Sequence, residues 1–258
     1  MNIRDKNTVH HALATATLME VGVKNNIQKV LDDVISYIHV LDLVYGSPLR
    51  TYHNYSHLVK MLEGAENKVY TKELVFAIIF HDFVYAITED EKNKFSPFTS
   101  NEEESAKVAK KFLAVIGATD KTIAIVDFYI CATKHPVVQT DFDVFGWLGQ
   151  KVKQITDTFD LSLYDERAII DTAKFIHDLD LLSLAQTNED IFKENQKNVT
   201  QEYLNANIPL DTIVIGRQKF FSQMLNQKEI FLSSWYAHEP RFAESALRSN
   251  VKRFILTK

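Results

Sequence analysis

Residues 72–85 read KELVFAIIFHDFVY, and apolar side chains occupy every position from Leu74 to Phe80. A helix that is hydrophobic on all sides lies in the interior of a protein, with other helices packed around it. The chain has only 7 glycines and 5 prolines in 258 residues, so it is poor in the residues that tight turns need. These observations exclude a turn-rich sandwich or barrel. They predict an all-α fold, a helical bundle with residues 72–85 in its middle.

Apolar residues recur at helical spacing over most of the chain, and the connections between the periodic segments are short. The other helices expected cover residues from about 25 to 45, from His53 to about Val69, 101–116, 120–134, 142–157, 163–184, 189–205, 210–226 and 239–256. Asp120, Asp141 and Ser162 stand where N-caps are expected, and the polar residues 88–100 predict a loop. A single helical domain over residues 1–258 is the simplest account, and a C-terminal helical subregion from about residue 186 is left open.

Charge and composition describe a globular protein with no general affinity for polyanions. The formal net charge is -5, so neither a stable nucleic acid partner nor membrane association is expected. Cys131 is the only cysteine, which rules out an intrachain disulfide. The first residues have no apolar signal core, and a cytoplasmic location is expected. A homo-oligomer is left open, because Phe220, Phe221 and Trp235 could form either core or a dimer surface.

Three segments of helical sequence together supply a set of histidines and aspartates, and the last two contain both residue types. They are RTYHNYSH (50–57), FHDF (80–83) and HDLDL (177–181). Imidazole nitrogens and carboxylate oxygens suit Mn, Fe, Mg or Zn rather than a thiolate site, and buried groups of this kind are costly unless paired or metal-bound. Two histidines four residues apart, His53 and His57, would share one helix face. Chance is a poor explanation for the set His57, His81, Asp82 and Asp180.

Other interpretations apply to some of these residues. His177 is better explained as a satisfied core histidine than as a ligand, and Asp178 as an exposed helix residue. The pair His53 and His57 has the spacing of a zinc peptidase motif. That motif needs a glutamate where this chain has Asn54, so a peptidase is excluded.

The order H…HD…D on a helical scaffold resembles the signature of the HD-domain metal-dependent phosphohydrolases. The closest resemblance is to a bacterial group known only as predicted metal-dependent HD-superfamily phosphohydrolases, and it covers roughly residues 40 to 256. The matching motifs are PLRxYHNxxH (48–57), FHDxVY (80–85), NExxSA (101–106), ATKH (132–135), DxDL (178–181), EY (202–203) and GR (216–217). The first motif is also similar to the YHNxxH signature of cyclic-nucleotide phosphodiesterases. The resemblance implies an HD-domain, phosphodiesterase-like helical bundle.

The resemblance also implies roles for individual residues. The metal ligands would be His57, His81, Asp82 and Asp180, with Asp178 as the fallback for Asp180. One or two divalent ions are implied, without distinction among Mn, Mg, Fe, Zn and Ni. His53 would be the general acid that protonates the leaving oxygen, a role that suits a side chain titrating near neutral pH. The alternative is that His53 packs or ligates metal.

Five further residues are candidates with an ordinary alternative beside each role. Arg50, Lys134 and His135 could form a cationic rim for phosphoryl oxygens. His135 could instead bind a second metal, and both Lys134 and His135 could simply lie at a helix end, where cations are favoured. Glu102 could orient the attacking water or form part of a solvated first turn. Asn54 could hold phosphate or a metal-bound water, or hydrogen-bond within its own turn.

The resulting hypothesis is a metal-dependent phosphohydrolase, a phosphomonoesterase or phosphodiesterase acting on a small phosphate ester such as a nucleotide. Residues 143–147 show no purine clamp, and the glutamine that grips the base in cyclic-nucleotide phosphodiesterases is not found, which argues against that activity. The Glu89-Asp90 pair, which superficially resembles that of alarmone hydrolases, lies in a polar segment. The alternative function is a module that senses nucleotide or phosphate ligands without turnover.

Overall fold

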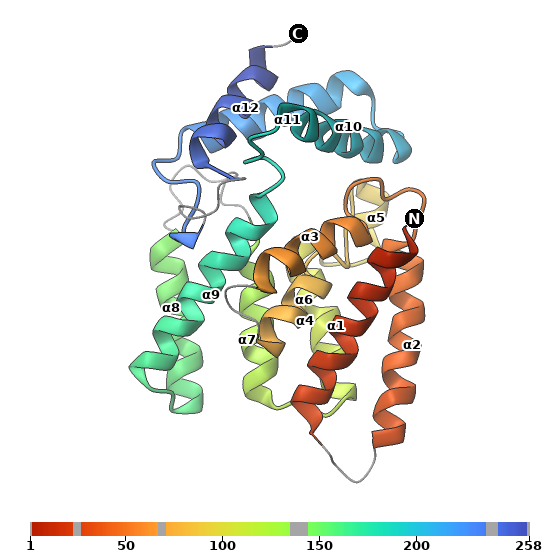
Figure 1. The fold of residues 1–258 in the computed structure, drawn as a ribbon, viewed down its shortest axis with the longest axis vertical. Helices are drawn as coiled ribbons and strands as arrows, with labels where there is room; N and C mark the ends of the chain where they lie inside the picture. The colour runs from red at the N-terminus through yellow and green to blue at the C-terminus, as the bar shows by residue number, and fades with distance from the viewer. Residues whose placement is uncertain (1, 23–26, 67–70, 135–143, 236–241, 257–258) are drawn as a thin grey trace.

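The computed structural model describes residues 2–22, 27–66, 71–134, 144–235 and 242–256, and these contain twelve α-helices and no strand (Figure 1). The all-α prediction is confirmed. The helices are α1 (Ile3–Val21), α2 (Ile27–Tyr45), α3 (Tyr55–Glu66), α4 (Lys72–Phe80), α5 (Glu89–Asn93), α6 (Asn101–Val115), α7 (Asp120–Ala132), α8 (Val144–Phe159), α9 (Leu163–Leu181), α10 (Glu189–Asn205), α11 (Leu210–Leu225) and α12 (Glu244–Leu256).

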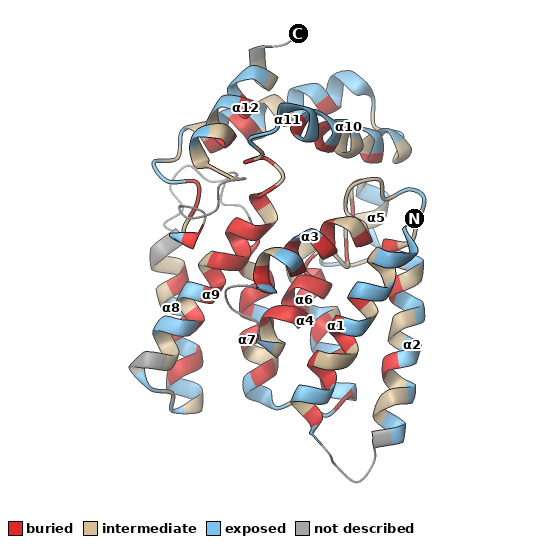
Figure 2. Ribbon diagram, viewed as in Figure 1, coloured by how far each residue is buried: buried red, intermediate tan, exposed pale blue. Residues whose placement is uncertain are grey.

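Helix α4 is the centre of the bundle, as its sequence predicts. Every residue from Leu74 to Phe80 is buried, and the helix packs against α1, α3, α6, α7 and α9. Figure 2 shows this burial as continuous red on α4, whereas the outer helices are red on one side only. Thr71 caps the helix by accepting a hydrogen bond from the backbone N–H of Leu74. The helix ends at Phe80, so the His-Asp pair that follows lies at the end of the most buried element.

Helix α1 was not anticipated from the sequence, although it covers one side of α4 and α3. Its buried residues include Val9, Leu13 and Val21 with small alanines between them, and histidine and threonine interrupt the pattern. Ala12, Ala16 and Thr17 make up half of its buried residues, and small or polar residues give a weak periodic signal because they contribute little hydrophobicity. Its packing partners reveal the buried face, which the sequence alone does not.

Two predicted boundaries and one predicted loop are corrected by the structure. The helix expected over residues 72–85 ends at Phe80, and residues 81–85 lie beyond it. The helix expected from His53 begins at Tyr55, so Arg50, His53 and Asn54 precede it in a non-helical segment. His53 and His57 therefore do not share a helix face. The segment 88–100, expected to be a loop throughout, contains the short helix α5, which a capping box between Thr88 and Glu91 stabilises.

The predicted N-caps have mixed outcomes. Ser162 caps α9 as expected, by accepting a hydrogen bond from the N–H of Asp165. The cap of α7 is Thr119, and Asp120 is the first helical residue, where a negative charge favours the helix dipole. Asp141 lies outside the described residues.

Helices α10, α11 and α12 lie across one end of the bundle, next to the segment that leads into α3 (Figure 1). Thr51 donates a hydrogen bond to the carbonyl of Asn198 in α10 at 2.6 Å, and Asn205 donates to the carbonyl of Leu49 at 3.1 Å. Helix α10 is thereby fixed over residues 49–54. Among the described residues, no helix combines the length and the apolar character that a membrane span requires.

The aromatic residues of the C-terminal third belong to the core. Phe221 and Trp235 are buried in the main hydrophobic cluster, and Phe220 packs against it while partly exposed. Of the two interpretations left open by the sequence, core and dimer surface, the structure shows the first for Phe221 and Trp235.

Candidate metal centre

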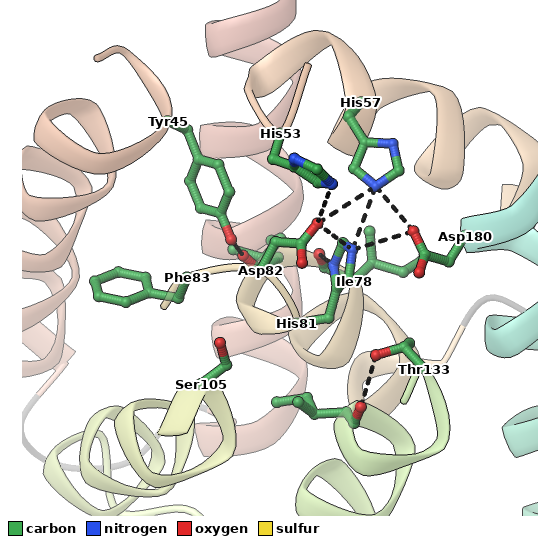
Figure 3. A network of polar contacts seen from close by, with 12 residues as sticks. Tyr45, His53, His57, Ile78, His81, Asp82, Phe83, Ser105, Thr133 and Asp180 are labelled. Atoms are coloured by element: carbon green, nitrogen blue, oxygen red, sulfur yellow. Dashed lines mark hydrogen bonds and ion pairs between the residues drawn. The ribbon is translucent and has the colours of Figure 1, made fainter. Parts of the chain in front are cut away.

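Four predicted ligands, from three different helices, meet at one point in the fold. His57 lies in the first turn of α3, His81 caps the end of α4, Asp82 follows it, and Asp180 lies in the last turn of α9. One ligand atom from each lies within 4.8 Å of those of the other three. Figure 3 shows the four side chains pointing toward a common centre. This group, the His57-His81-Asp82-Asp180 cluster, could hold a metal ion.

The separations within the cluster are those of neighbouring ligands on one ion. His57 Nε2 lies 3.3 Å from His81 Nε2 and 3.2 Å from Asp180 Oδ1. Asp82 Oδ2 lies 2.9 Å from His81 Nε2 and 3.7 Å from His57 Nε2. Ligands held about 2.0–2.2 Å from a common ion are themselves about 3 Å apart. The cluster could therefore hold a small divalent cation.

The hydrogen bonds around the cluster leave electron pairs facing its centre. His81 Nδ1 lies 2.9 Å from the carbonyl oxygen of Ile78, which can only accept, so Nδ1 carries a proton and donates it. The other ring nitrogen, Nε2, is then the one offered to the centre. Asp82 Oδ2 is buried and lies 2.9 Å from His81 Nε2. A buried carboxylate oxygen needs a positive charge beside it, which a proton on His81 Nε2 or a cation at the centre would supply.

The pKa values show that the cluster attracts positive charge. Burial lowers the pKa of His57 below its ordinary value. Burial acts on His81 in the same direction, but the carboxylates of Asp82 and Asp180 outweigh it and raise the pKa of His81 well above its ordinary value. Burial favours the neutral form of Asp82, yet His81 and His53 hold its pKa well below the usual range. A proton on His81 or a metal ion could supply the charge that the carboxylates favour.

Arg50 positions the Asp82 backbone. Its guanidinium donates to the carbonyl of Asp82 at 2.6 Å and to that of Phe83 at 2.9 Å, and it lies over the ring of Tyr45 at 5.3 Å. The C-terminal carbonyls of α4 have no helical partner, and a forked cation satisfies two carbonyls at once. The structure thus brings Arg50 beside the cluster, with two of its donors on the main chain. A contact with phosphate stays a prediction.

His53 stands next to the cluster rather than in it. Its Nε2 is 4.0 Å from Asp82 Oδ2, and its Nδ1 is 2.6 Å from Glu202 Oε2 on α10. Its ring lies against that of Tyr85, with centroids 4.0 Å apart. Burial lowers the pKa of His53, but Asp82 and Glu202 outweigh this effect and raise it. One ring nitrogen is thus fixed by a carboxylate while the other faces the candidate metal centre.

Glu202 is a residue that the site prediction missed. Its side chain is almost fully buried, and Oε1 has no hydrogen-bond partner while Oε2 holds His53. The only sequence signal was its place in the EY pair of the resemblance, which assigned it no role. A single glutamate on a largely polar helix cannot be distinguished from a solvated one until the fold shows its burial.

Asp178 was expected to be an exposed helix residue, and the structure shows that expectation to be wrong. Its side chain is fully buried and accepts hydrogen bonds from the N–H of Leu232 at 2.8 Å, the N–H of Ser233 at 2.7 Å and the Ser233 hydroxyl at 2.5 Å. Asp178 therefore anchors the segment after α11. His177, expected in the core, is buried beside it. Asp180, rather than Asp178, lies in the cluster.

Of the remaining candidates, Asn54 and Lys134 are not part of the cluster. Asn54 donates to the carbonyls of Arg50 and Thr51 and accepts from the N–H of Ser56, so its hydrogen bonds are those of its own turn. Lys134 forms an ion pair with Glu103 at 3.2 Å. His135 lies outside the described residues.

Glu102 is partly buried in the first turn of α6, and no hydrogen bond or ion pair joins it to the cluster among the described residues. It lines a cavity of about 1200 Å³ whose wall also includes Lys134 and His177, one helical turn before Asp180. Its proposed role with water stays a prediction.

Comparison with known proteins leaves the family open. No protein-family model matches the chain, and no curated protein is significantly similar to it. The geometry of the site therefore carries the functional argument.

Proposed function

We propose that this protein is a metal-dependent phosphohydrolase of the HD type that cleaves a small phosphate ester, such as a nucleotide. The observation that carries the proposal is the pairing of the His57-His81-Asp82-Asp180 cluster with His53. The cluster supplies mixed nitrogen and oxygen ligands, and His53 stands 4.0 Å from Asp82 without occupying a ligand position. The cluster alone fits many metalloproteins. The added histidine, fixed by a buried glutamate, supports acid–base chemistry at the same place.

A divalent ion in the cluster would polarise a phosphoryl group and make a water nucleophilic near neutral pH. Proton transfer and the positioning of the ligands would depend on the protein's own residues. His53 Nδ1 donates to Glu202, so Nε2 is the atom that holds and releases a proton on the side of the cluster. Its pKa is raised by Asp82 and Glu202, which favours the protonated form that a general acid to a leaving oxygen requires. Arg50 fixes the position of the Asp82 backbone next to His81.

The test compares hydrolysis of a panel of nucleotides and phosphate esters by metal-loaded protein and by the double variant His81→Ala, Asp82→Ala. The proposal expects hydrolysis by the wild type and its loss in the variant. A matched control is His39→Ala, Asp90→Ala, which removes the same residue types from exposed positions. Equal activity of wild type and His81→Ala, Asp82→Ala would overturn the proposal. Tight ligand binding without hydrolysis under several divalent metals would favour the alternative, a ligand-sensing module.

A further inference from the structure

Arg217 is a largely enclosed cation without a carboxylate partner. It lies on α11, and its guanidinium donates to the side-chain oxygen of Gln196 on α10. Its Nε is shielded from solvent and has no hydrogen-bond partner, and no ion pair involves Arg217 within the described part of the chain. Enclosing a charge is costly unless a counter-ion is present. Among the described residues the structure shows this partly buried cation and no counter-ion for it.

The aromatic contacts of Arg217 leave its donors available. The guanidinium carbon lies 5.1 Å from the ring centroid of Phe221 and 5.1 Å from that of Phe254, over each ring. Such contacts use the faces of the planar guanidinium and contribute modestly to its stability. Oxyanions bind in the plane, at the N–H edge, often through two parallel hydrogen bonds. Stacking therefore holds the group in place and is compatible with an anion at its edge.

Arg217 belongs to the same region as the candidate metal centre. Burial lowers its pKa, and the groups that act against this effect are Tyr203, Tyr85 and Tyr52. Tyr85 packs on the ring of His53, and the ring centroid of Tyr52 lies 5.2 Å from that of His57. Both tyrosines flank the candidate metal centre, and helix α10 joins that centre to Arg217, because it carries both Gln196, which holds Arg217, and Glu202, which holds His53.

We propose that Arg217 binds a second oxyanion of the substrate, a phosphate or a carboxylate remote from the phosphate that is cleaved. The substrate class is then a phosphate ester that carries a second anionic group. This inference rests on the proposed function, because it places the scissile phosphate at the metal cluster. The second anion would use the free N–H groups of Arg217 and supply the missing counter-charge.

The experiment measures binding of non-hydrolysable probes to the metal-loaded protein by calorimetry. The probes are alkanediphosphonates of increasing chain length, each compared with the alkylphosphonate of the same length. At one length, the wild type should bind the diphosphonate about 10–100-fold more tightly, the range expected for a charge-assisted hydrogen-bonded contact. Phosphonocarboxylates of that length then show whether a carboxylate serves as well. The metal content of the protein is measured after each titration, to show that the probe has not extracted the ion.

The variants are Arg217→Gln and Arg217→Lys, with Arg253→Gln as the control. Arg253 is an exposed arginine on α12, one residue before Phe254, so its loss makes the same change of charge close by. Arg217→Gln should abolish the preference for the diphosphonate, Arg217→Lys should keep part of it, and Arg253→Gln should leave it unchanged. Thermal melting identifies a variant that fails to fold, and Arg217→Lys then carries the comparison.

Two outcomes would overturn the inference. One is a wild type with no preference for the diphosphonate at any chain length. The other is a preference that survives in folded Arg217→Gln. Because binding rather than turnover is measured, absence of hydrolysis would count against the proposed function and leave the Arg217 result standing. Hydrolysis without any diphosphonate preference would count against Arg217 alone.

Discussion

His57 Nε2 and His81 Nε2 lie 3.3 Å apart in the interior of the protein. The two residues come from α3 and from the end of α4, and both are almost fully buried. Because His81 Nδ1 is held by the carbonyl of Ile78, the Nε2 atoms face each other with the oxygens of Asp82 and Asp180 beside them. Such a convergence of electron donors is unfavourable without a positive charge among them. The predictions below follow from this arrangement.

Substitution of Asp178 should affect stability, and substitution of Asp180 should affect metal binding. Asp180→Ala should lower metal affinity by at least about 10–100-fold, with little effect on the melting temperature of the metal-free protein. Asp178→Ala should retain metal binding but lose about 2–4 kcal/mol of folding free energy, because it removes the acceptor of the partly buried backbone donors of Leu232 and Ser233 and of the Ser233 hydroxyl. Metal titration and denaturant unfolding of both variants check this. The opposite pattern would reassign the ligand to Asp178.

Arg50 should act on the metal through the backbone of Asp82. Arg50→Lys keeps the charge but cannot reproduce the forked contact with two carbonyls. We expect metal affinity to fall about 10–100-fold, as for other residues that orient ligands. Direct metal titration measures this without substrate. Unchanged metal affinity together with a raised KM would instead show that Arg50 serves mainly to bind phosphate.

His53 should be needed for turnover but not for metal. His53→Ala should lower kcat about 10²–10⁴-fold on substrates with a basic leaving group, and much less on an aryl phosphate whose leaving group needs no proton. Metal content, measured in parallel, should stay at the wild-type level. An equal loss on both kinds of substrate would argue against an acid role.

The pH profile should depend on Glu202. Burial lowers the pKa of His53, and the carboxylates of Asp82 and Glu202 outweigh it, so the net shift is upward. A general acid works only while protonated, and activity should therefore fall as pH rises through this raised pKa. Glu202→Gln removes one of the two negative charges that raise the pKa of His53. The fall of activity at alkaline pH, the alkaline limb of the profile, should therefore occur at lower pH. A limb that stays in place in Glu202→Gln would contradict the pairing of His53 with Glu202.

Metal binding should release a proton. The carboxylates raise the pKa of His81 well above its ordinary value, and a ligand must be deprotonated to bind metal. Below that pKa, affinity should rise about 10-fold per pH unit as the competing proton is removed. Calorimetry in buffers of different ionisation enthalpy measures the number of protons released. Affinity that is independent of pH would show that His81 does not bind the ion through Nε2.

Several features of the fold and the site could be predicted from the sequence, because they depend on local pattern. The uniform apolarity of Leu74–Phe80 predicted the central helix. The choice of Asp180 over Asp178 rested on resemblance, and helix geometry explains why only one can serve. Residues two apart on a helix point in nearly opposite directions. Asp180 lies in the cluster, and Asp178 binds the segment after α11.

The remaining features depend on contacts between distant segments. Arg50 was expected in a cationic rim for phosphoryl oxygens, but its partners in the structure are backbone carbonyls, which carry no sequence signal. Glu202 is 149 residues from His53 in the chain, and nothing in its own helix distinguishes it. Helix α1 was missed because small or polar residues, Ala12, Ala16 and Thr17, form half of its buried face.

The most direct test of the central claim is elemental analysis of the purified protein after loading with a divalent metal and removal of the excess. The account predicts a stoichiometric ion in the wild type and in the exposed-site control His39→Ala, Asp90→Ala. It predicts loss of that ion in His81→Ala, Asp82→Ala, with the folded state of each protein checked by circular dichroism. A wild type without bound metal, or a folded His81→Ala, Asp82→Ala variant with the full wild-type metal content, would contradict the account.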